Sequence, residues 1–195
     1  MPPTDAGDSG VRDACTPSLV INEVKADGTS PADEFVEIYN TSSCTAALTN
    51  YTLYYSSAAG SAPFLIWTGV DVDIIDANGY FIVCGDGYTP ANGVHYARWQ
   101  NLMSPPNGIL SKNGGGVGLF NPATNPIDGV AYATITTTMH PFIHPSKLPD
   151  GGAAPPAPNP PTNQSIARFP NGANSDNNSV DFKVLATPTP GASNQ

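Results

Sequence analysis

Hydrophobic and polar residues alternate along short stretches of this chain, and clusters of turn-forming residues separate the stretches. Alternation with a period of two is clear in LVINEV (residues 19–24), EFVEIYN (34–40) and VDVDII (70–75). GYFIVCG is instead a continuous apolar run of the kind found in central strands. Further runs of strand length are ALTNYTLYYSS, APFLIWTG, GVHYARW, GGGVGLFN and IDGVAYATI, followed by residues 165–169 and 181–185.

These runs predict an all-β protein. Apolar residues nowhere recur at i, i+3, i+4 and i+7 over a helical length. Strands repeated about every ten residues and divided by turns are typical of a β-sandwich or a β-barrel. Composition agrees, because charged residues make up only 12% of the 195 residues while Pro (21) and Gly (19) are abundant. Few charges and many turn formers argue against a helical bundle.

Two segments fall outside this pattern. Residues 1–14 are polar and aperiodic, so we expect a flexible N-terminal tail or stalk. Residues from about 136 to 163 form a Pro-rich insert that we expect to run extended along the sandwich, contacting it through Phe142, Ile143 and Leu148. The remaining chain, residues 15–195, is predicted to be one domain that contains this insert.

The charge of the chain constrains its partners. Sixteen acidic residues oppose seven basic ones, and the formal net charge is −9. A surface of that sign repels phosphate backbones, so nucleic acid is an unlikely partner. No apolar run approaches the roughly 20 residues that span a bilayer, and no secretory leader is recognisable. We therefore expect either a cytosolic protein or one whose leader has been removed.

The three cysteines bear on that choice. Cys15 lies just before the first strand run and Cys44 lies in a polar turn, so a disulfide between them is plausible. It would close a loop of about 30 residues and contribute ~3.6 kcal/mol to stability. A disulfide indicates an oxidising compartment. The alternative is three free thiols in the cytosol, and Cys84 is expected as a buried strand residue in either case.

The ordered set of these segments resembles the lamin-tail domain as it occurs in bacterial secreted proteins. The segments that carry the resemblance are LVINEV…DEFVEIYN, LTNYTLYY, GYFIVCG, GGGVGLFN, DGVAYA and QSIARFPNG…DNNSVDF…TPTPGASN. The resemblance implies an immunoglobulin-like β-sandwich that carries no catalytic residues. It also implies a secreted or cell-surface location. One form of this is a lipoprotein whose leader is absent from this sequence. Nuclear relatives bind proteins and chromatin, but the acidic balance of this chain puts the chromatin role in doubt.

Candidate ligand-binding residues are few. Asp27, Asp33 and Glu34 crowd the first turn and the second strand run, and their carboxylates are the ligand type that calcium prefers. Calcium is therefore an alternative to our expectation that no cofactor is bound. His140, Phe142 and His144 lie in the Pro-rich insert. Either this loop binds a ligand or a metal through these residues, or it is a loop stiffened by proline that binds neither.

The function that we predict is a non-catalytic extracellular or cell-surface module. It would recognise a protein or a glycan, or assemble with copies of itself, through sheet edges and loops. The alternative is an accessory or metal-dependent domain of an extracellular hydrolase. No GxSxG turn, Ser/His/Asp order or phosphate-binding loop is present in the sequence.

Overall fold

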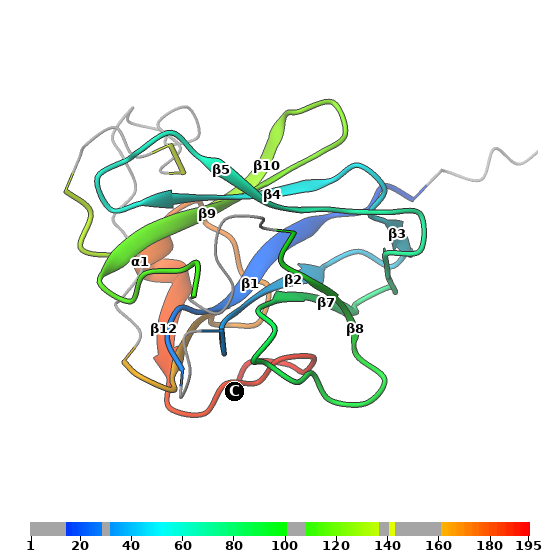
Figure 1. Cartoon of the computed structure of the whole chain (residues 1–195). Coiled ribbons are helices and arrows are strands. Elements are labelled where there is room, and N and C mark those ends of the chain that lie inside the picture. The colour runs from blue at the N-terminus through cyan, green and yellow to red at the C-terminus, as the bar shows by residue number, and fades with distance from the viewer. Residues whose placement is uncertain (1–14, 29–31, 101–107, 137–140, 143–160) are drawn as a thin grey trace, which may run out of the picture.

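The chain folds into two β-sheets packed face to face, with a third, very small sheet at one side (Figure 1). The computed structural model describes residues 15–28, 32–100, 108–136, 141–142 and 161–195. The larger sheet has six strands in the order β12 (Phe182–Leu185), β11 (Ser165–Arg168), β1 (Leu19–Lys25), β2 (Phe35–Asn40), β7 (Tyr80–Cys84) and β8 (His95–Arg98). Its neighbouring strands are antiparallel except for β7 and β8, which are parallel.

The opposing sheet has four antiparallel strands in the order β10 (Pro126–Ala133), β9 (Gly114–Phe120), β4 (Thr52–Ser57) and β5 (Phe64–Thr68). Strands β3 (Ala46–Ala47) and β6 (Ile74–Ile75) form the small two-stranded sheet. One four-residue helix, α1 (Asn178–Asp181), precedes β12. The fold is the predicted all-β, immunoglobulin-like sandwich.

The core lies between the two larger sheets and follows from the alternation in the sequence. Alternate residues of each strand face the opposing sheet, and fully buried side chains from both sheets meet there. Trp67 of β5 packs on Phe81 of β7 with ring centroids 5.5 Å apart, so aromatic contact joins the sheets. Trp67 is fully buried in this core.

The outward face of the six-stranded sheet is also covered, which is unusual for an antiparallel sheet. Every residue of β1 is buried. Phe35, Ile82 and Cys84 form a second, smaller apolar cluster on this sheet, with Tyr88 and Val94 packed against it. The last residues of the chain lie beneath β1, β2 and β7 in Figure 1 and contact the buried carboxylates of this face.

The outward face of the four-stranded sheet holds part of the predicted insert. The Phe142 side chain is only 2% exposed and lies over Gly118, where an added Cβ would stand 2.4 Å from the Phe142 ring. The predicted contact of Phe142 with the sandwich is confirmed. Ile143, Leu148 and most of residues 136–163 lie outside the described residues, as do residues 1–14.

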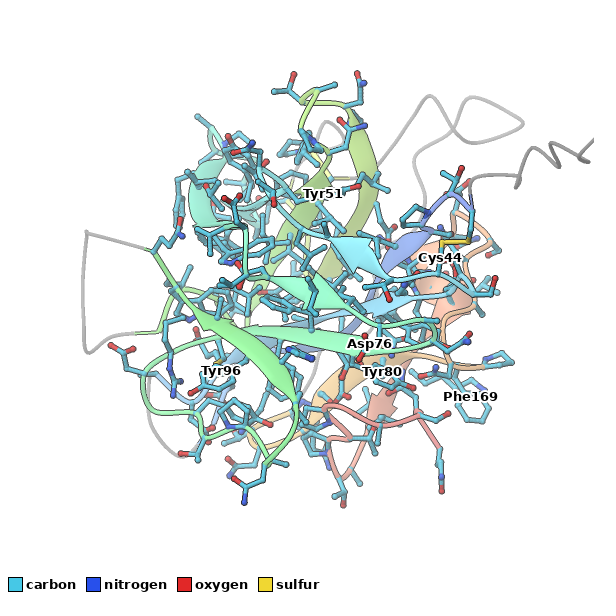
Figure 2. The ribbon with its side chains drawn as sticks, turned by 90° about the vertical axis from the view of Figure 1, so that its right-hand side faces the viewer. Cys44, Tyr51, Asp76, Tyr80, Tyr96 and Phe169 are labelled. Atoms are coloured by element: carbon cyan, nitrogen blue, oxygen red, sulfur yellow. A yellow bond between two sulfur atoms is a disulfide. The ribbon has the colours of Figure 1, made fainter. Side chains whose placement is uncertain are left out.

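The structure joins Cys15 and Cys44 in a disulfide, with Cα atoms 6.0 Å apart, as predicted. The bridge ties the residues before β1 to the loop that follows β2, and Figure 2 shows it beside the Cys44 label. Cys84 is buried in β7 and is not bridged.

Two local predictions were wrong. Only Ile74 and Ile75 of the expected strand 70–75 are extended, because the Asp73 carboxylate accepts the backbone N–H of Val70 at 2.9 Å and closes a turn. Helix α1 was not predicted, and its last residue, Asp181, was expected to begin the final strand. Among the described residues, no helix is long and apolar enough to cross a membrane.

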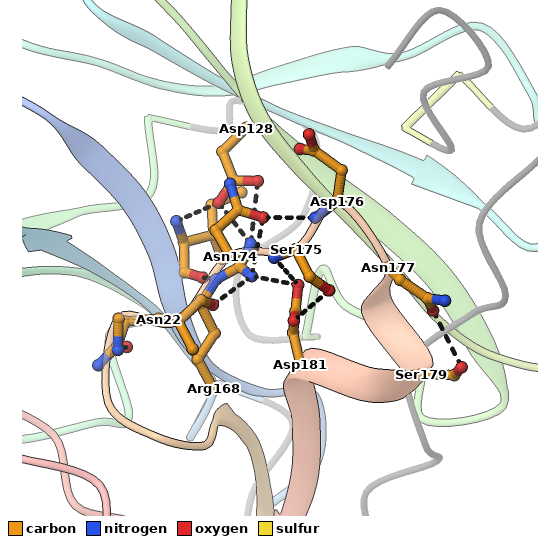
Figure 3. Close-up of polar contacts among 12 residues, drawn as sticks. Asn22, Asp128, Arg168, Asn174, Ser175, Asp176, Asn177, Ser179 and Asp181 are labelled. Atoms are coloured by element: carbon orange, nitrogen blue, oxygen red, sulfur yellow. Dashed lines mark hydrogen bonds and ion pairs between the residues drawn. The ribbon is translucent and has the colours of Figure 1, made fainter. Parts of the chain in front are cut away.

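A buried arginine connects the two sheets at the edge where β11 faces β10 (Figure 3). Arg168 is fully buried, and its Nη2 donates to both carboxylate oxygens of Asp128 at 3.0 and 2.8 Å. Its Nη1 donates to Asp181 Oδ2 at 3.0 Å, and its guanidinium lies 4.7 Å from the centre of the Phe182 ring. One cation thus holds two buried carboxylates, each from a different part of the chain.

The same group completes the hydrogen bonding of an irregular point in β1. The pairing of β1 with β2 shifts register between Ile21 and Glu23, and such a bulge interrupts the ladder. The Ile21 carbonyl accepts from Arg168 Nε at 2.8 Å, and the Ile21 N–H donates to Asp128 Oδ2 at 2.7 Å. The ion pair therefore also provides partners for backbone groups that would otherwise be buried without any.

Replacing Arg168 with Met tests this arrangement. The substitution leaves Asp128 and Asp181 buried without their cation, so we expect a loss of about 3–5 kcal/mol of unfolding free energy. Urea denaturation measures it. Lys183→Ala, which removes an exposed cation from β12, is the matched control and should change stability by about 0.5 kcal/mol or less. Equal unfolding midpoints for the two variants would contradict the role given to Arg168.

Candidate binding surfaces

A shallow pocket of about 150 Å³ opens at the end of the six-stranded sheet where β7 begins. Three residues with polar side chains line it: Asp76, Tyr80 and His95. The remaining walls come from Val94 and three glycines, namely Gly79, Gly93 and Gly191. Figure 2 shows Asp76 next to Tyr80 on this side of the molecule. The pocket therefore combines segments from the middle and the very end of the chain.

The turn between β6 and β7 places the Asp76 carboxylate. The Asp76 carbonyl accepts from the Asn40 side chain at 3.0 Å and from the Gly79 N–H at 2.9 Å, and these bonds fix the backbone. Asn78 has a φ of 53°, a conformation that Asn tolerates better than most residues. The Asp76 side chain is exposed and makes no hydrogen bond to another described residue. Its oxygens are therefore free to accept from a ligand.

Tyr80 is held from two sides. Its ring stacks on the Tyr39 ring with centroids 4.8 Å apart, and its hydroxyl oxygen accepts from Asn171 Nδ2 at 3.2 Å. Burial raises the pKa of Tyr80, with the Asn171 bond lowering it and the nearby Glu37 raising it further. The hydroxyl thus keeps its proton at neutral pH, and the Ser193 hydroxyl is a second hydrogen-bond partner beside it.

The opposite wall of the pocket is formed by the residues just before β8 and by its first residue, His95. Gly93 has a φ of +85°, and an added Cβ there would meet no atom within 4 Å, so the backbone is open to solvent at this point. His95 begins β8 and is exposed. Val94 packs against Gly191, where a Cβ would stand 2.6 Å from a Val94 methyl group. This contact brings the C-terminal segment against the pocket.

The C-terminal segment, residues 186–195, is fastened by a buried pair of glutamates. Glu23 and Glu37 are opposite each other on β1 and β2, and neither is exposed. Gly191 N–H donates to Glu37 Oε2 at 2.6 Å, and Thr189 N–H donates to the Glu23 carboxylate at 3.1 and 3.2 Å. The wall formed by Gly191 therefore depends on these two carboxylates.

Asparagine side chains complete this attachment. Asn22 Nδ2 donates to Glu37 Oε1 at 2.8 Å and to Asn171 Oδ1 at 3.0 Å. The buried Asn194 donates through its Nδ2 to the Arg168 carbonyl at 3.0 Å. The end of the chain is thereby linked to the same strand that carries the buried arginine.

Burial and the proximity of Glu23 raise the pKa of Glu37 to about 8. Burial also raises the pKa of Glu23, against the bonds from Ser165 and Thr189 and the attraction of Lys25. The pair therefore retains at least one proton at neutral pH, which reduces repulsion between two adjacent buried carboxylates. Lys25, Tyr80 and Tyr88 also interact with this pair, and burial raises the pKa of both tyrosines, which keeps them neutral at pH 7.

A second exposed feature lies on β5, the edge strand of the four-stranded sheet, and on the turn that follows it. Four large apolar side chains between residues 64 and 72 are exposed, by 40% (Phe64), 41% (Leu65), 49% (Val70) and 81% (Val72). We call these four residues the β5 edge. Part of the β5 backbone is already hydrogen-bonded. The Gln100 side chain donates to the Thr68 carbonyl and accepts from the Thr68 N–H, both at 2.9 Å.

The predicted metal candidates are close in space but already have protein partners. Asp33 accepts from Lys25 Nζ at 2.9 Å, and Asp27 accepts from the Thr162 hydroxyl at 2.7 Å. Glu34 Oε2 accepts the N–H groups of Ile109 and Leu110 at 2.7 and 3.0 Å. Burial raises the pKa of Glu34 to about 7, opposed by those two bonds and supported by Asp27 and Asp33.

Across the residues that the structure describes, no group of three or more His, Cys, Asp or Glu side chains is arranged to hold a metal ion. Calcium binding stays a prediction. His140 and His144 lie outside the described residues. Phe142 lies buried against the four-stranded sheet, and a binding role for it stays a prediction.

Sequence reasoning missed Glu37, Asn22 and Arg168 as residues that hold the C-terminal segment in place. The available signal was polar residues inside otherwise apolar strands, such as Glu37 in FVEIYN and Arg168 in SIAR. Their partners come from the far end of the chain, and the sequence pattern does not show that pairing.

The sandwich, the disulfide and the surface pocket define an immunoglobulin-like β module. The profile of the Lamin Tail Domain family matches residues 13–134, so the chain belongs to this family. Comparison with curated proteins gives no match. Strands β11 and β12, helix α1 and the C-terminal segment lie beyond the matched residues, although β11 pairs directly with β1.

The buried glutamates predict that stability depends on pH. The folded state keeps the Glu37 proton up to about pH 8, whereas the unfolded chain releases it near 4.5. The stabilisation is therefore complete below about pH 4.5 and is lost as pH rises toward 8. Glu37→Gln should reduce the slope of unfolding free energy against pH by up to about 1.4 kcal/mol per pH unit.

Urea denaturation at several pH values between these limits measures the slope. The matched control is Asp71→Asn, which neutralises an exposed carboxylate of the β5–β6 turn and should leave the slope unchanged. A slope that is the same in Glu37→Gln and in the wild-type protein would refute the buried proton.

Proposed function

We propose that this lamin tail domain is an extracellular recognition module that binds a protein partner through the β5 edge. Lamin tail domains are a non-enzymatic, immunoglobulin-like family and generally act as protein-interaction modules. The proposal adds a location and a surface to that general role.

The observation that carries the proposal is the exposure of the β5 edge. Half of the eight exposed large apolar side chains in the described part of the chain lie within residues 64–72. Clustered exposed apolar residues mark interaction sites more often than scattered ones do. An edge strand also supports contact with another chain, and here Gln100 occupies the backbone groups of Thr68. We therefore place the contact on side chains rather than on strand addition.

The disulfide supports the extracellular location. Disulfides persist in oxidising compartments and are rare where thiols are kept reduced. The Cys15–Cys44 bridge has a Cα separation within the range that a disulfide requires. The metal-dependent hydrolase considered as an alternative gains no support from the described residues or from the family.

Substitutions on the β5 edge test the proposal. Leu65→Asp and Val72→Asp place a charge on the edge while leaving the core intact, since both side chains are already exposed. Purified variants would be incubated with proteins released from the surface of the producing cells, and captured proteins quantified. We expect at least a tenfold loss of the captured partner, because a buried unpaired charge costs more than about 1.4 kcal/mol.

Val180→Asp is the matched control, because Val180 is 61% exposed but lies in helix α1 rather than in the four-stranded sheet. It should capture the partner as the wild-type protein does. Sedimentation of the purified chain, with and without Val72→Asp, distinguishes a second copy of this chain from a different protein. Identical capture by the edge variants and by wild type would contradict the proposal.

A further inference from the structure

We propose that the pocket formed by Asp76, Tyr80 and His95 binds one sugar ring of a glycan. This site lies on the six-stranded sheet and is separate from the β5 edge of the four-stranded sheet. It goes beyond a protein-interaction role and does not depend on it.

The polar groups of the pocket match a ligand whose own groups both donate and accept hydrogen bonds. The Asp76 carboxylate accepts only, and no described residue uses its oxygens. The Tyr80 oxygen accepts from Asn171, and its O–H can donate either to the neighbouring Ser193 hydroxyl or to a ligand. The His95 imidazole provides a donor and an acceptor when neutral. Neighbouring sugar hydroxyls can satisfy acceptors and donors of this kind together.

Other ligand classes fit these groups less well. An anion such as phosphate would be repelled by Asp76 and by a chain of net charge −9. A cation would pair with Asp76 but would offer no hydrogen-bond acceptor to Tyr80 or His95. An apolar ligand would leave these polar groups without partners, which costs free energy. A neutral polyhydroxylated ligand satisfies each of them.

The shape of the pocket agrees with this ligand. A volume of about 150 Å³ suits a single ring rather than a whole oligosaccharide. Glycines at positions 79, 93 and 191 add no side chains to the walls, so a ring can approach the main chain closely. Exposed residues at the mouth, Asp76, Gly93 and His95, leave the rest of a glycan in solvent.

The walls are also held in place before a ligand arrives. The Tyr80 ring is stacked on Tyr39, and Gly191 is bonded to the buried Glu37. Preorganisation of this kind reduces the entropy that binding would otherwise lose. A single ring with a few hydrogen bonds still binds weakly, and we expect a dissociation constant of about 1 mM, which corresponds to roughly −4 kcal/mol.

Nuclear magnetic resonance titration of the full ¹⁵N-labelled chain tests the proposal. The probes are glucose, galactose, mannose, fucose and N-acetylglucosamine, added singly. For at least one of them we expect saturable shifts of the amides of Gly79, Gly93 and Gly191. The amides of Gly116 and Gly118, on the other sheet, should not move.

Two variants make the test specific. Asp76→Asn removes the charged acceptor and should weaken binding about tenfold, as expected for a hydrogen bond to a charged group. Asp71→Asn changes a nearby exposed carboxylate outside the pocket and should bind as the wild-type protein does. Matching amide spectra for the three proteins without sugar would show that the fold is kept.

Three results would overturn the proposal. They are the absence of shifts with all five sugars, equal affinity of Asp76→Asn and wild type, and a larger response of the same glycines to free arginine amide. None of them affects capture of a protein by the β5 edge, so failure of the pocket and failure of the proposed function are distinguishable.

Discussion

The buried guanidinium of Arg168 is the contact on which the arrangement of the sheets and of the chain's end depends. It comes from β11 in the six-stranded sheet and binds Asp128 on β10 of the other sheet. It also binds Asp181 before β12 and the Ile21 carbonyl at the irregular point of β1. A buried charge is costly unless it is paired and fully hydrogen-bonded, and here every part of the guanidinium has a partner. The pairing therefore specifies which segments meet at this edge.

The C-terminal segment contacts the strand that carries Arg168, and it also forms part of the pocket wall. Asn194 donates to the Arg168 carbonyl, and Gly191 and Thr189 donate to Glu37 and Glu23. These contacts cover the outward face of the six-stranded sheet and place Gly191 in the pocket wall. Although the family profile ends at residue 134, the residues beyond it complete the sheet and its covering.

The sequence predicted the sandwich well because alternation reports directly which face of a strand is buried. The prediction was weakest where polar side chains decide the local structure. Asp73 ended a strand by bonding to Val70, and a turn of helix formed before Phe182. Arg168 and Asp128 are 40 residues apart, and Glu37 and Gly191 are 154 apart. No local pattern encodes such pairs. A glutamate in a strand, such as Glu37, is therefore predicted to face solvent unless the segment that covers it is known.

Amide hydrogen exchange of the native protein tests most directly whether the C-terminal segment is an integral part of this domain. The amides of Thr189 and Gly191 bond to buried carboxylates, as the Ile21 amide bonds to Asp128. We expect all three amides to exchange slowly, with opening free energies near that of global unfolding. Exchange of Thr189 and Gly191 at the rate of an unstructured peptide, while Ile21 stays protected, would contradict it.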